Sequence, residues 1–288
     1  MNKLLVLLTL LLSLSFSQIS CSQENETKNK TDTLKQDSVP LMTDSIEIDA
    51  SITDEEYYDY SIDSAASGIN FFPKGNYINV KNKISSIRIK LKEEFLKSKS
   101  DTDKQKITDT ARTIFTDYLI NDIIPFWYGT EWDYNGYTNT PNKGVIACGY
   151  FVSTTLKHMG LNINRYTLAQ QAPHNEALTF EPDSNLLIFN TDTLFETNEF
   201  SGFFKNLEAK LKPGLYFVGL DSHVGYLLVK KNKAYFIHSN YIDGYVMLER
   251  IFNSAAFRSS IYYIADITYN DNLIKQWLLN STMKVNVK

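Results

Sequence analysis

The chain has 288 residues and a formal net charge of −4, from 29 Lys and Arg residues against 33 Asp and Glu residues. The basic residues are scattered or in short pairs, which argues against a nucleic-acid-binding protein, because such proteins concentrate positive charge on one surface. Two cysteines are too few for a disulfide framework, and the length suits one sizeable domain.

The N-terminus has the pattern of a secretory signal. Residues 1–20 contain Lys3, an apolar run over residues 4–12 and a small polar end, which is too short to span a bilayer as a mature helix. Cys21 follows directly, and the segment resembles the signal of bacterial lipoproteins, although Gln18 stands where that family usually has leucine. The resemblance implies lipid attachment at Cys21 and stable membrane anchoring. The alternative is an ordinary cleaved signal with an incidental cysteine.

Residues 21–65 are rich in Ser, Thr, Asp, Glu, Lys and Asn, with few large apolar side chains. Such a segment cannot bury enough apolar surface to offset the chain entropy that folding would remove. We therefore expect a flexible tether over these residues and one folded domain over residues 66–288.

Two amphipathic helices are expected at the start of the domain. Apolar residues recur at helical spacing over residues 84–95 and again over residues 107–119. Residues 100–104, Ser-Asp-Thr-Asp-Lys, supply a capping residue and acidic first-turn charge for the second helix. This helix must end before Pro125.

A third helix is expected over residues 148–159, with an apolar face and Gly160 as its stop. A short strand at 186–189 and a short helix at 200–207 follow. The rest of the chain consists of strand-like runs separated by turn residues, and then a closing helix. The runs cover residues 214–220, 223–229, 234–240, 244–251 and 259–267, and the closing helix covers 273–279. Helices followed by a strand meander predict an α+β fold.

Cys148 begins the third expected helix and lies between Gly144 and Gly149, which leave room for a substrate carbonyl. A helix N-terminus lowers the pKa of a cysteine, so we expect a reactive thiolate that iodoacetamide alkylates near pH 6. The backbone N–H at a helix start is also suited to bind an oxyanion. The alternative is a buried, inert cysteine on an amphipathic helix.

The four histidines fall into two groups. His158 occupies the last turn of the third helix, a surface or capping position, and His174 falls in a loop. His223 and His238 flank two expected strands that are joined by the turn at residues 230–233, so the hairpin brings them to the same end. A catalytic base and the group that orients it need this proximity.

Residues 211–240 resemble the second half of an NlpC/P60-type papain-like cysteine peptidase domain, and the match extends in the expected order over about residues 125–250. The matching segments are Pro213-Gly214, His223-Val224-Gly225-Tyr226 and Phe236-Ile237-His238-Ser239. Upstream, residues 129–136 occupy the place of the family's Trp-Gly-Gly loop.

The chain departs from the family pattern in four places. Leu215 stands where the family has aspartate, and Trp132 where its loop has tyrosine. The family's Asp-Cys-Ser-Gly is here Ala-Cys-Gly-Tyr over residues 147–150, and the gap from Cys148 to His223 is longer than usual. These departures concern substrate preference more than the nucleophile.

The resemblance implies a papain-like core in which the nucleophile helix packs on an antiparallel sheet, with additional N-terminal helices. It implies that Cys148 attacks an acyl carbon, that His223 takes the thiol proton, and that His238 orients His223. Trp132 would donate its indole N–H near the oxyanion or form a wall of the cleft.

The third catalytic role has rival candidates, because a carboxamide or carboxylate orients an imidazole equally well. Asn240 and Asp243 are therefore alternatives to His238. A metal site built from Cys148, His223 and His238 is a weaker alternative, since no Cys-x-x-Cys or His-x-x-x-His spacing is present. We expect no metal and no cofactor.

These features together predict a lipid-anchored cysteine hydrolase that cleaves amide bonds through a thioester, in the bacterial periplasm or at the cell surface. The family's usual substrates are cell-wall peptides, so peptidoglycan is the expected partner besides the membrane, and no nucleic acid is expected. One alternative is an acyltransferase or an amidase on a non-wall substrate with the same fold. Another is a non-catalytic lipoprotein that binds a peptide or glycan.

Overall fold

The computed structural model describes residues 62, 67–182, 185–193 and 197–287. The expected signal at residues 1–20, the lipid site at Cys21 and almost all of the expected tether lie outside these residues and stay predictions. None of the helices within the described ranges combines the length and the hydrophobicity that a membrane span requires.

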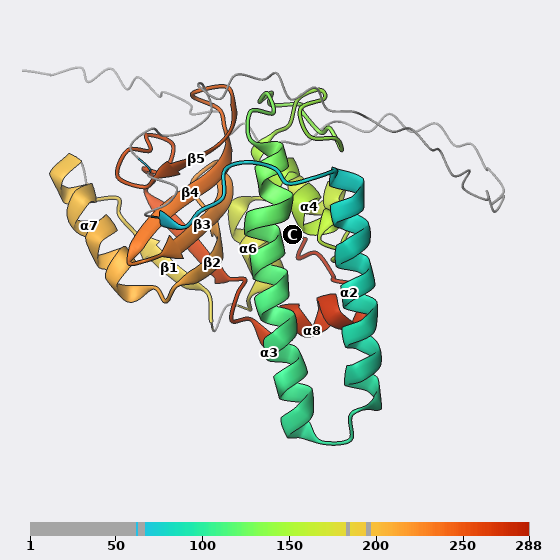
Figure 1. Ribbon diagram of the computed structural model, residues 1–288. Helices are drawn as coiled ribbons and strands as arrows, with labels where there is room; N and C mark the ends of the chain where they lie inside the picture. The colour runs from blue at the N-terminus through green and yellow to red at the C-terminus, as the bar shows by residue number, and fades with distance from the viewer. Residues whose placement is uncertain (1–61, 63–66, 183–184, 194–196, 288) are drawn as a thin grey trace, which may run out of the picture. The chain divides into compact units, whose positions relative to one another are not determined.

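A six-stranded antiparallel sheet forms the centre of the fold (Figure 1). Its strands lie in the order β1-β6-β2-β3-β4-β5, so that β2 to β5 form a meander and β6 returns beside β2. Their bounds are β1 Leu187–Asn190, β2 Gly214–Gly219, β3 Val224–Lys230, β4 Lys233–Asn240, β5 Tyr245–Arg250 and β6 Ile261–Asp266. The predicted α+β class and the predicted strands are confirmed.

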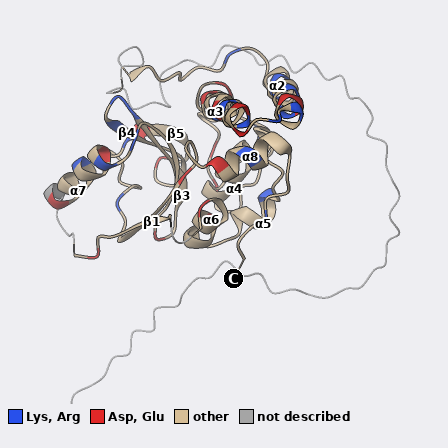
Figure 2. Ribbon diagram, turned by 90° about the horizontal axis from the view of Figure 1, so that it is seen from below, with Lys and Arg blue, Asp and Glu red and all other residues tan. Residues whose placement is uncertain are grey.

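Helices cover both faces of this sheet (Figures 1 and 2). On one face, α7 (Thr197–Lys210) packs its apolar side chains against the sheet. On the other face, α4 (Cys148–His158) contacts β3 and β4, and α6 (Pro173–Phe180) contacts β2 and β6. The remaining α-helices are α2 Tyr77–Lys97, α3 Asp101–Tyr118, α5 Arg165–Ala169 and α8 Asp271–Leu279. The helix that begins at Cys148 therefore packs on an antiparallel sheet, as expected.

The helix boundaries follow from capping chemistry. The Ser100 side chain accepts a hydrogen bond from the Asp103 N–H and caps α3, as the sequence predicts. The α-helical part ends at Tyr118, and a π turn over Leu119–Ile123 followed by a 3₁₀ turn over Ile124–Trp127 carries the chain past Pro125. The short helices α5 and α6 were not predicted, because neither is long enough to show a clear apolar period.

The hairpin between β3 and β4 turns on Lys231 and Asn232, which have φ angles of 50° and 57°. Two successive positive φ angles match the twist of a two-residue antiparallel connection. The resulting register pairs Tyr226 with Ile237 and brings His223 and His238 to the same end of the hairpin, as predicted.

Gly225 on β3 is the position where the sheet tolerates no side chain. A Cβ atom there would lie 2.6 Å from Cε2 of Phe236 and 2.9 Å from Cβ of His238. We expect Gly225→Ala to lower the free energy of unfolding in urea by about 1–3 kcal/mol, the usual cost of overpacking. Gly202→Ala on α7 is the matched control, since a Cβ there meets nothing within 4 Å. An unfolding midpoint for Gly225→Ala equal to that of the unaltered chain would contradict the close contact.

Candidate active site

Cys148 is the first residue of α4 and is partly buried. The preceding Ala147 provides no side-chain cap, so the first N–H groups of the helix remain available. The N–H groups of Cys148, Gly149 and Val224 lie close enough to the sulfur to favour its charged form. The thiol thus lies between a helix start and the first residue of β3, within a cluster of backbone donors.

The Cys148 thiol is nevertheless un-ionised at neutral pH. Burial, and secondarily the carboxyl group of Glu176, raise its pKa to about 11, although the three N–H groups act in the opposite direction. The sequence-based expectation of a lowered thiol pKa is therefore wrong. That expectation considered the helix terminus alone, whereas the loss of hydration and the nearby acid have the larger effect.

Three buried side chains form a continuous hydrogen-bonded relay. Nε2 of His223 lies 2.8 Å from Nδ1 of His238, and Nε2 of His238 lies 2.9 Å from Oε1 of Glu249. Burial lowers the pKa of His238 to about 3, and burial together with the neighbouring His238 lowers the pKa of His223 well below its ordinary value. Both imidazoles are therefore neutral at pH 7.

The direction of each hydrogen bond in this relay follows from Glu249. A carboxylate only accepts hydrogen bonds, so Nε2 of His238 carries its proton and Nδ1 of His238 is an acceptor. Nε2 of His223 must then donate to that acceptor. Nδ1 of His223 is left without a proton, which is the state a general base requires.

The thiol lies near Val224, the first residue of β3, and His223 of the relay is the residue before it. His238 and Glu249 lie on the face of the sheet that α7 covers, whereas α4 packs on the other face. His223 directly precedes Val224, whose N–H lies near the sulfur, and the His223 ring packs against Phe236, His238 and Tyr241. No hydrogen bond joins the thiol to either histidine in the described part of the chain. Such bonds often tighten only when substrate binds.

The two rivals of His238 are engaged elsewhere. The Asn240 side chain donates to Asp243 and accepts from the Ile242 N–H, which closes the turn after β4. His238 is therefore the sequence-predicted candidate that contacts His223. Glu249 was missed, and the signal for it was a single acid inside the apolar run of residues 244–251.

Trp132 lies beside this relay. Its ring centroid is 6.3 Å from that of Tyr241, which in turn is 5.1 Å from that of His223. The indole Nε1 is buried and has no hydrogen-bond partner among the described residues. A buried donor without an acceptor has lost its hydration without compensation, and a substrate oxygen would supply the missing acceptor.

Glu176 on α6 is a second feature that the sequence did not reveal. Its carboxyl group is 2% exposed, and its Oε2 has no hydrogen-bond partner among the described residues. Burial raises its pKa well above the ordinary value. Its Oε1 lies so close to α4 that a Cβ on Gly149 would be 3.1 Å from it. The carboxyl group thus occupies space that Gly149, the residue after Cys148, leaves open.

The other two histidines have separate environments. His174 stacks on Tyr263 with a ring-centroid distance of 4.6 Å. His158 is not a surface cation: its Nδ1 lies 2.7 Å from the Tyr77 hydroxyl, and burial lowers its pKa to about 3. A positively charged His158 was expected to interact favourably with the dipole at the C-terminal end of α4. His158 is neutral instead, because the end of α4 packs against α2 and buries the imidazole.

The raised thiol pKa gives a direct prediction. In a Cys21→Ser variant, where Cys148 is the sole thiol, alkylation by iodoacetamide should accelerate about tenfold per pH unit from pH 7 to pH 10, because only the thiolate reacts. A free cysteine, whose pKa is about 8.5, would level off near pH 9.5. Mass spectrometry of the modified peptide measures the rate. Fast labelling that is independent of pH near pH 6 would contradict the neutral thiol.

Within the described ranges, no cluster of three or more His, Cys, Asp or Glu residues is arranged to hold a metal ion. Comparisons with protein-family models, with curated proteins and with solved structures gave no match for this chain.

Proposed function

We propose that this chain is a papain-like cysteine hydrolase that cleaves amide bonds through a thioester intermediate. The observation that supports this most strongly is the relay from Glu249 through His238 to His223, because it leaves an unprotonated nitrogen on the residue before Val224, whose N–H lies near the Cys148 sulfur. A histidine pair with a purely structural role does not need a defined direction of its hydrogen bonds. A catalytic base needs it, because its free nitrogen must accept the proton of the nucleophile.

In the proposed reaction, the Cys148 sulfur attacks the amide carbonyl carbon while the thiol proton moves to Nδ1 of His223. The carbonyl oxygen becomes an oxyanion, for which the N–H groups at the start of α4 and the Trp132 indole are available donors. The imidazolium then gives its proton to the leaving amine, and the C–N bond breaks. Water, deprotonated by the same imidazole, hydrolyses the thioester and restores the thiol.

The neutral thiol and neutral imidazole define how this reaction begins. A preformed thiolate–imidazolium pair would require a low thiol pKa, and the thiol pKa is about 11. Proton transfer therefore accompanies the attack on the bound substrate. Glu249 supports this step, because its carboxylate stabilises the positive charge that forms on the relay.

Peptide bonds of peptidoglycan are the proposed substrate, and the proposed place of action is the outer side of a bacterial membrane, with the chain anchored by lipid at Cys21. The family resemblance and the exported N-terminus support this assignment. An amidase on a non-wall substrate and an acyltransferase use the same thioester and differ only in what the sulfur attacks or in what receives the acyl group.

A binding protein without catalysis is the second candidate function. The raised thiol pKa and the absence of a thiol–imidazole hydrogen bond in the described residues favour it. In that case the buried donor of Trp132 would hold a peptide or glycan that is not cleaved.

The test is incubation of the full chain with purified peptidoglycan, followed by mass spectrometry of the soluble products. We expect release of peptide fragments by the unaltered chain and none by Cys148→Ala, the matched control. Equal release by both would contradict thiol chemistry. Binding to peptidoglycan by both, without release by either, would support the binding protein.

A further inference from the structure

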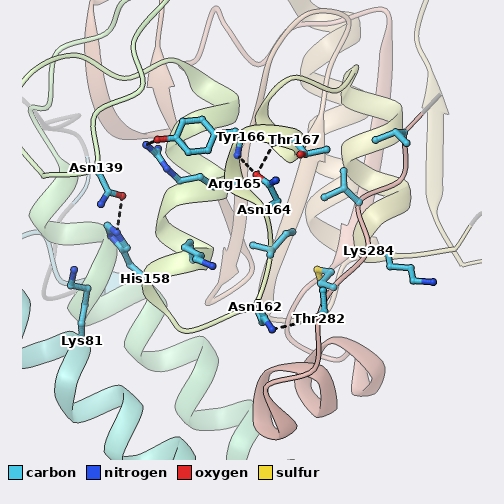
Figure 3. A pocket seen from close by; sticks show the side chains of 15 residues that line it. Lys81, Asn139, His158, Asn162, Asn164, Arg165, Tyr166, Thr167, Thr282 and Lys284 are labelled. Atoms are coloured by element: carbon cyan, nitrogen blue, oxygen red, sulfur yellow. Dashed lines mark hydrogen bonds between the residues drawn. The ribbon is translucent and has the colours of Figure 1, made fainter. Parts of the chain in front are cut away.

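A wide groove lies at the C-terminal end of α4, away from Cys148, and has a volume of about 1180 Å³ (Figure 3). It is larger than the usual range for small-molecule sites, which reaches about 1,000 Å³. Residues from α2, α4, α5 and the segment after α8 line it. We call it the basic groove and define it by its cationic and amide residues Lys81, Lys157, Arg165, Lys284, Asn139 and Asn164.

The basic groove contains four cations, and none of its fifteen lining residues is acidic. This is the reverse of the whole chain, which has more acidic than basic residues. None of the four cations forms an ion pair with a carboxylate in the described part of the chain. Arg165 is 7% exposed, and its guanidinium donates to neutral oxygens of Thr154, Tyr137 and Tyr166 and lies over the Tyr150 and Tyr166 rings, with no carboxylate partner among the described residues. A buried cation is usually paired with an anion.

The asparagines at the rim present their N–H groups. Oδ1 of Asn139 can only accept, so Nε2 of the neutral His158 carries the proton, and Nδ1 of His158 accepts from the Tyr77 hydroxyl. Because its oxygen is occupied, Asn139 has its amide N–H groups left for a ligand.

Asn164 also has its amide N–H groups left as donors, because its oxygen is used to cap α5. Its Oδ1 caps α5 by accepting hydrogen bonds from the backbone N–H groups of Tyr166 and Thr167 (Figure 3). Its amide nitrogen therefore remains a donor. The walls of the basic groove combine ammonium, guanidinium and amide donors, and this set matches an anionic ligand.

The pKa of His158 responds to the positive charges of the basic groove. Besides burial, the charges of Lys81, Arg165 and Lys157 lower its pKa. Three of the four groove cations therefore act on one imidazole, which places their charges in one electrostatic environment.

We propose that the basic groove binds a short acidic peptide. The cations are spread rather than focused, with Lys81 and Lys284 on opposite sides of the groove in Figure 3, whereas a single phosphate needs donors that converge on one point. Apolar side chains between them, including Ile163, Met283 and Val285, suit a ligand that has apolar atoms between its charges. An extended peptide with several carboxylates has this pattern.

This inference goes beyond the proposed hydrolase, because binding in the basic groove needs no thiol. Cys148 and Lys157 lie at opposite ends of α4, about 14 Å apart at 1.5 Å per residue. Peptide binding should therefore survive in Cys148→Ala, so that failure of the catalytic proposal and failure of this one are distinguishable.

The test is fluorescence anisotropy of the full chain with a labelled six-residue peptide of alternating Glu and Val, at about 0.1 M ionic strength, where the Debye length is about 10 Å. The matched probe has Gln in place of each Glu. We expect the acidic peptide to bind at least about tenfold more tightly than the Gln peptide, and salt to weaken it. Lys157→Glu combined with Lys284→Glu should weaken it about tenfold, since both side chains are exposed and each reversal turns attraction into repulsion.

The control variant combines Lys99→Glu with Lys205→Glu, two exposed positions outside the groove that give the same change in net charge. It should bind within about twofold of the unaltered chain, because exposed charges beyond a Debye length are screened. Equal weakening by the control, or equal binding of the Gln peptide, would overturn the proposal. Displacement by inorganic tripolyphosphate at lower concentration than by unlabelled peptide would overturn the assignment to a peptide.

Discussion

Replacing His223 with alanine is expected to lower kcat for amide hydrolysis by about 10⁶-fold, the loss seen when one member of a coupled catalytic unit is removed. We expect kcat to depend strongly on His223 because the Cys148 thiol, with a pKa of about 11, does not ionise at pH 7 without a base. Rates on a chromogenic peptide amide, or on peptidoglycan fragments, measure the effect.

The double variant Cys148→Ala with His223→Ala separates a catalytic from a structural role. If the two residues act as one unit, the double variant should be no slower than either single variant. Alkylation of Cys148 in His223→Ala should remain fast at pH 10, because hydroxide then ionises the thiol without the imidazole. A loss of kcat below about a hundredfold would show that another group takes the thiol proton, since general bases contribute about 10²–10⁴.

Replacing Glu249 with glutamine is expected to lower kcat by about a thousandfold, within the range that general acid–base assistance supplies, with little change in KM. The glutamine amide has no negative charge to stabilise the relay when His223 becomes protonated. Its NH₂ group can also donate to Nε2 of His238, which reverses the tautomers and leaves His223 without its free nitrogen.

Glu208→Gln is the matched control for this variant. Glu208 forms an ion pair with Arg250, one residue beyond Glu249, at 2.9 Å, so its replacement has the same chemistry but does not touch the relay. We expect its kcat to stay within about threefold, because Glu208 contacts Arg250 and the Ala234 N–H and neither belongs to the relay. Equal kcat in Glu249→Gln and Glu208→Gln would remove Glu249 from the mechanism.

The parts of this site that depend on local chain geometry were predictable from the sequence. Two apolar strand-like runs flank the short turn between His223 and His238, and the φ angles at Lys231 and Asn232 are those of a two-residue hairpin. Since that turn fixes the register, the approach of the two histidines followed from the sequence alone. The start of α4 at Cys148 followed from its apolar period.

The parts that depend on distant segments were not predictable. Glu249 reaches His238 through the pairing of β5 with β4, whose register no local pattern defines. Glu176 comes from the short, unpredicted helix α6 and meets Cys148 only through tertiary packing. The sign of the thiol pKa shift depends on burial at that contact, so a sequence argument based on the helix terminus gave the wrong direction.

The buried carboxyl group of Glu176 affects how readily the Cys148 thiol is oxidised. Thiolates attack peroxides and disulfides, so oxidation of a cysteine follows its thiolate character and exposure. Glu176 helps to keep the Cys148 thiol protonated and so limits the formation of sulfenic acid on it. The described residues contain no second cysteine that could form a disulfide with the oxidised sulfur. In the proposed hydrolase, the same contact between Glu176 and Cys148 would slow the first attack on substrate and protect the thiol from oxidation between substrates.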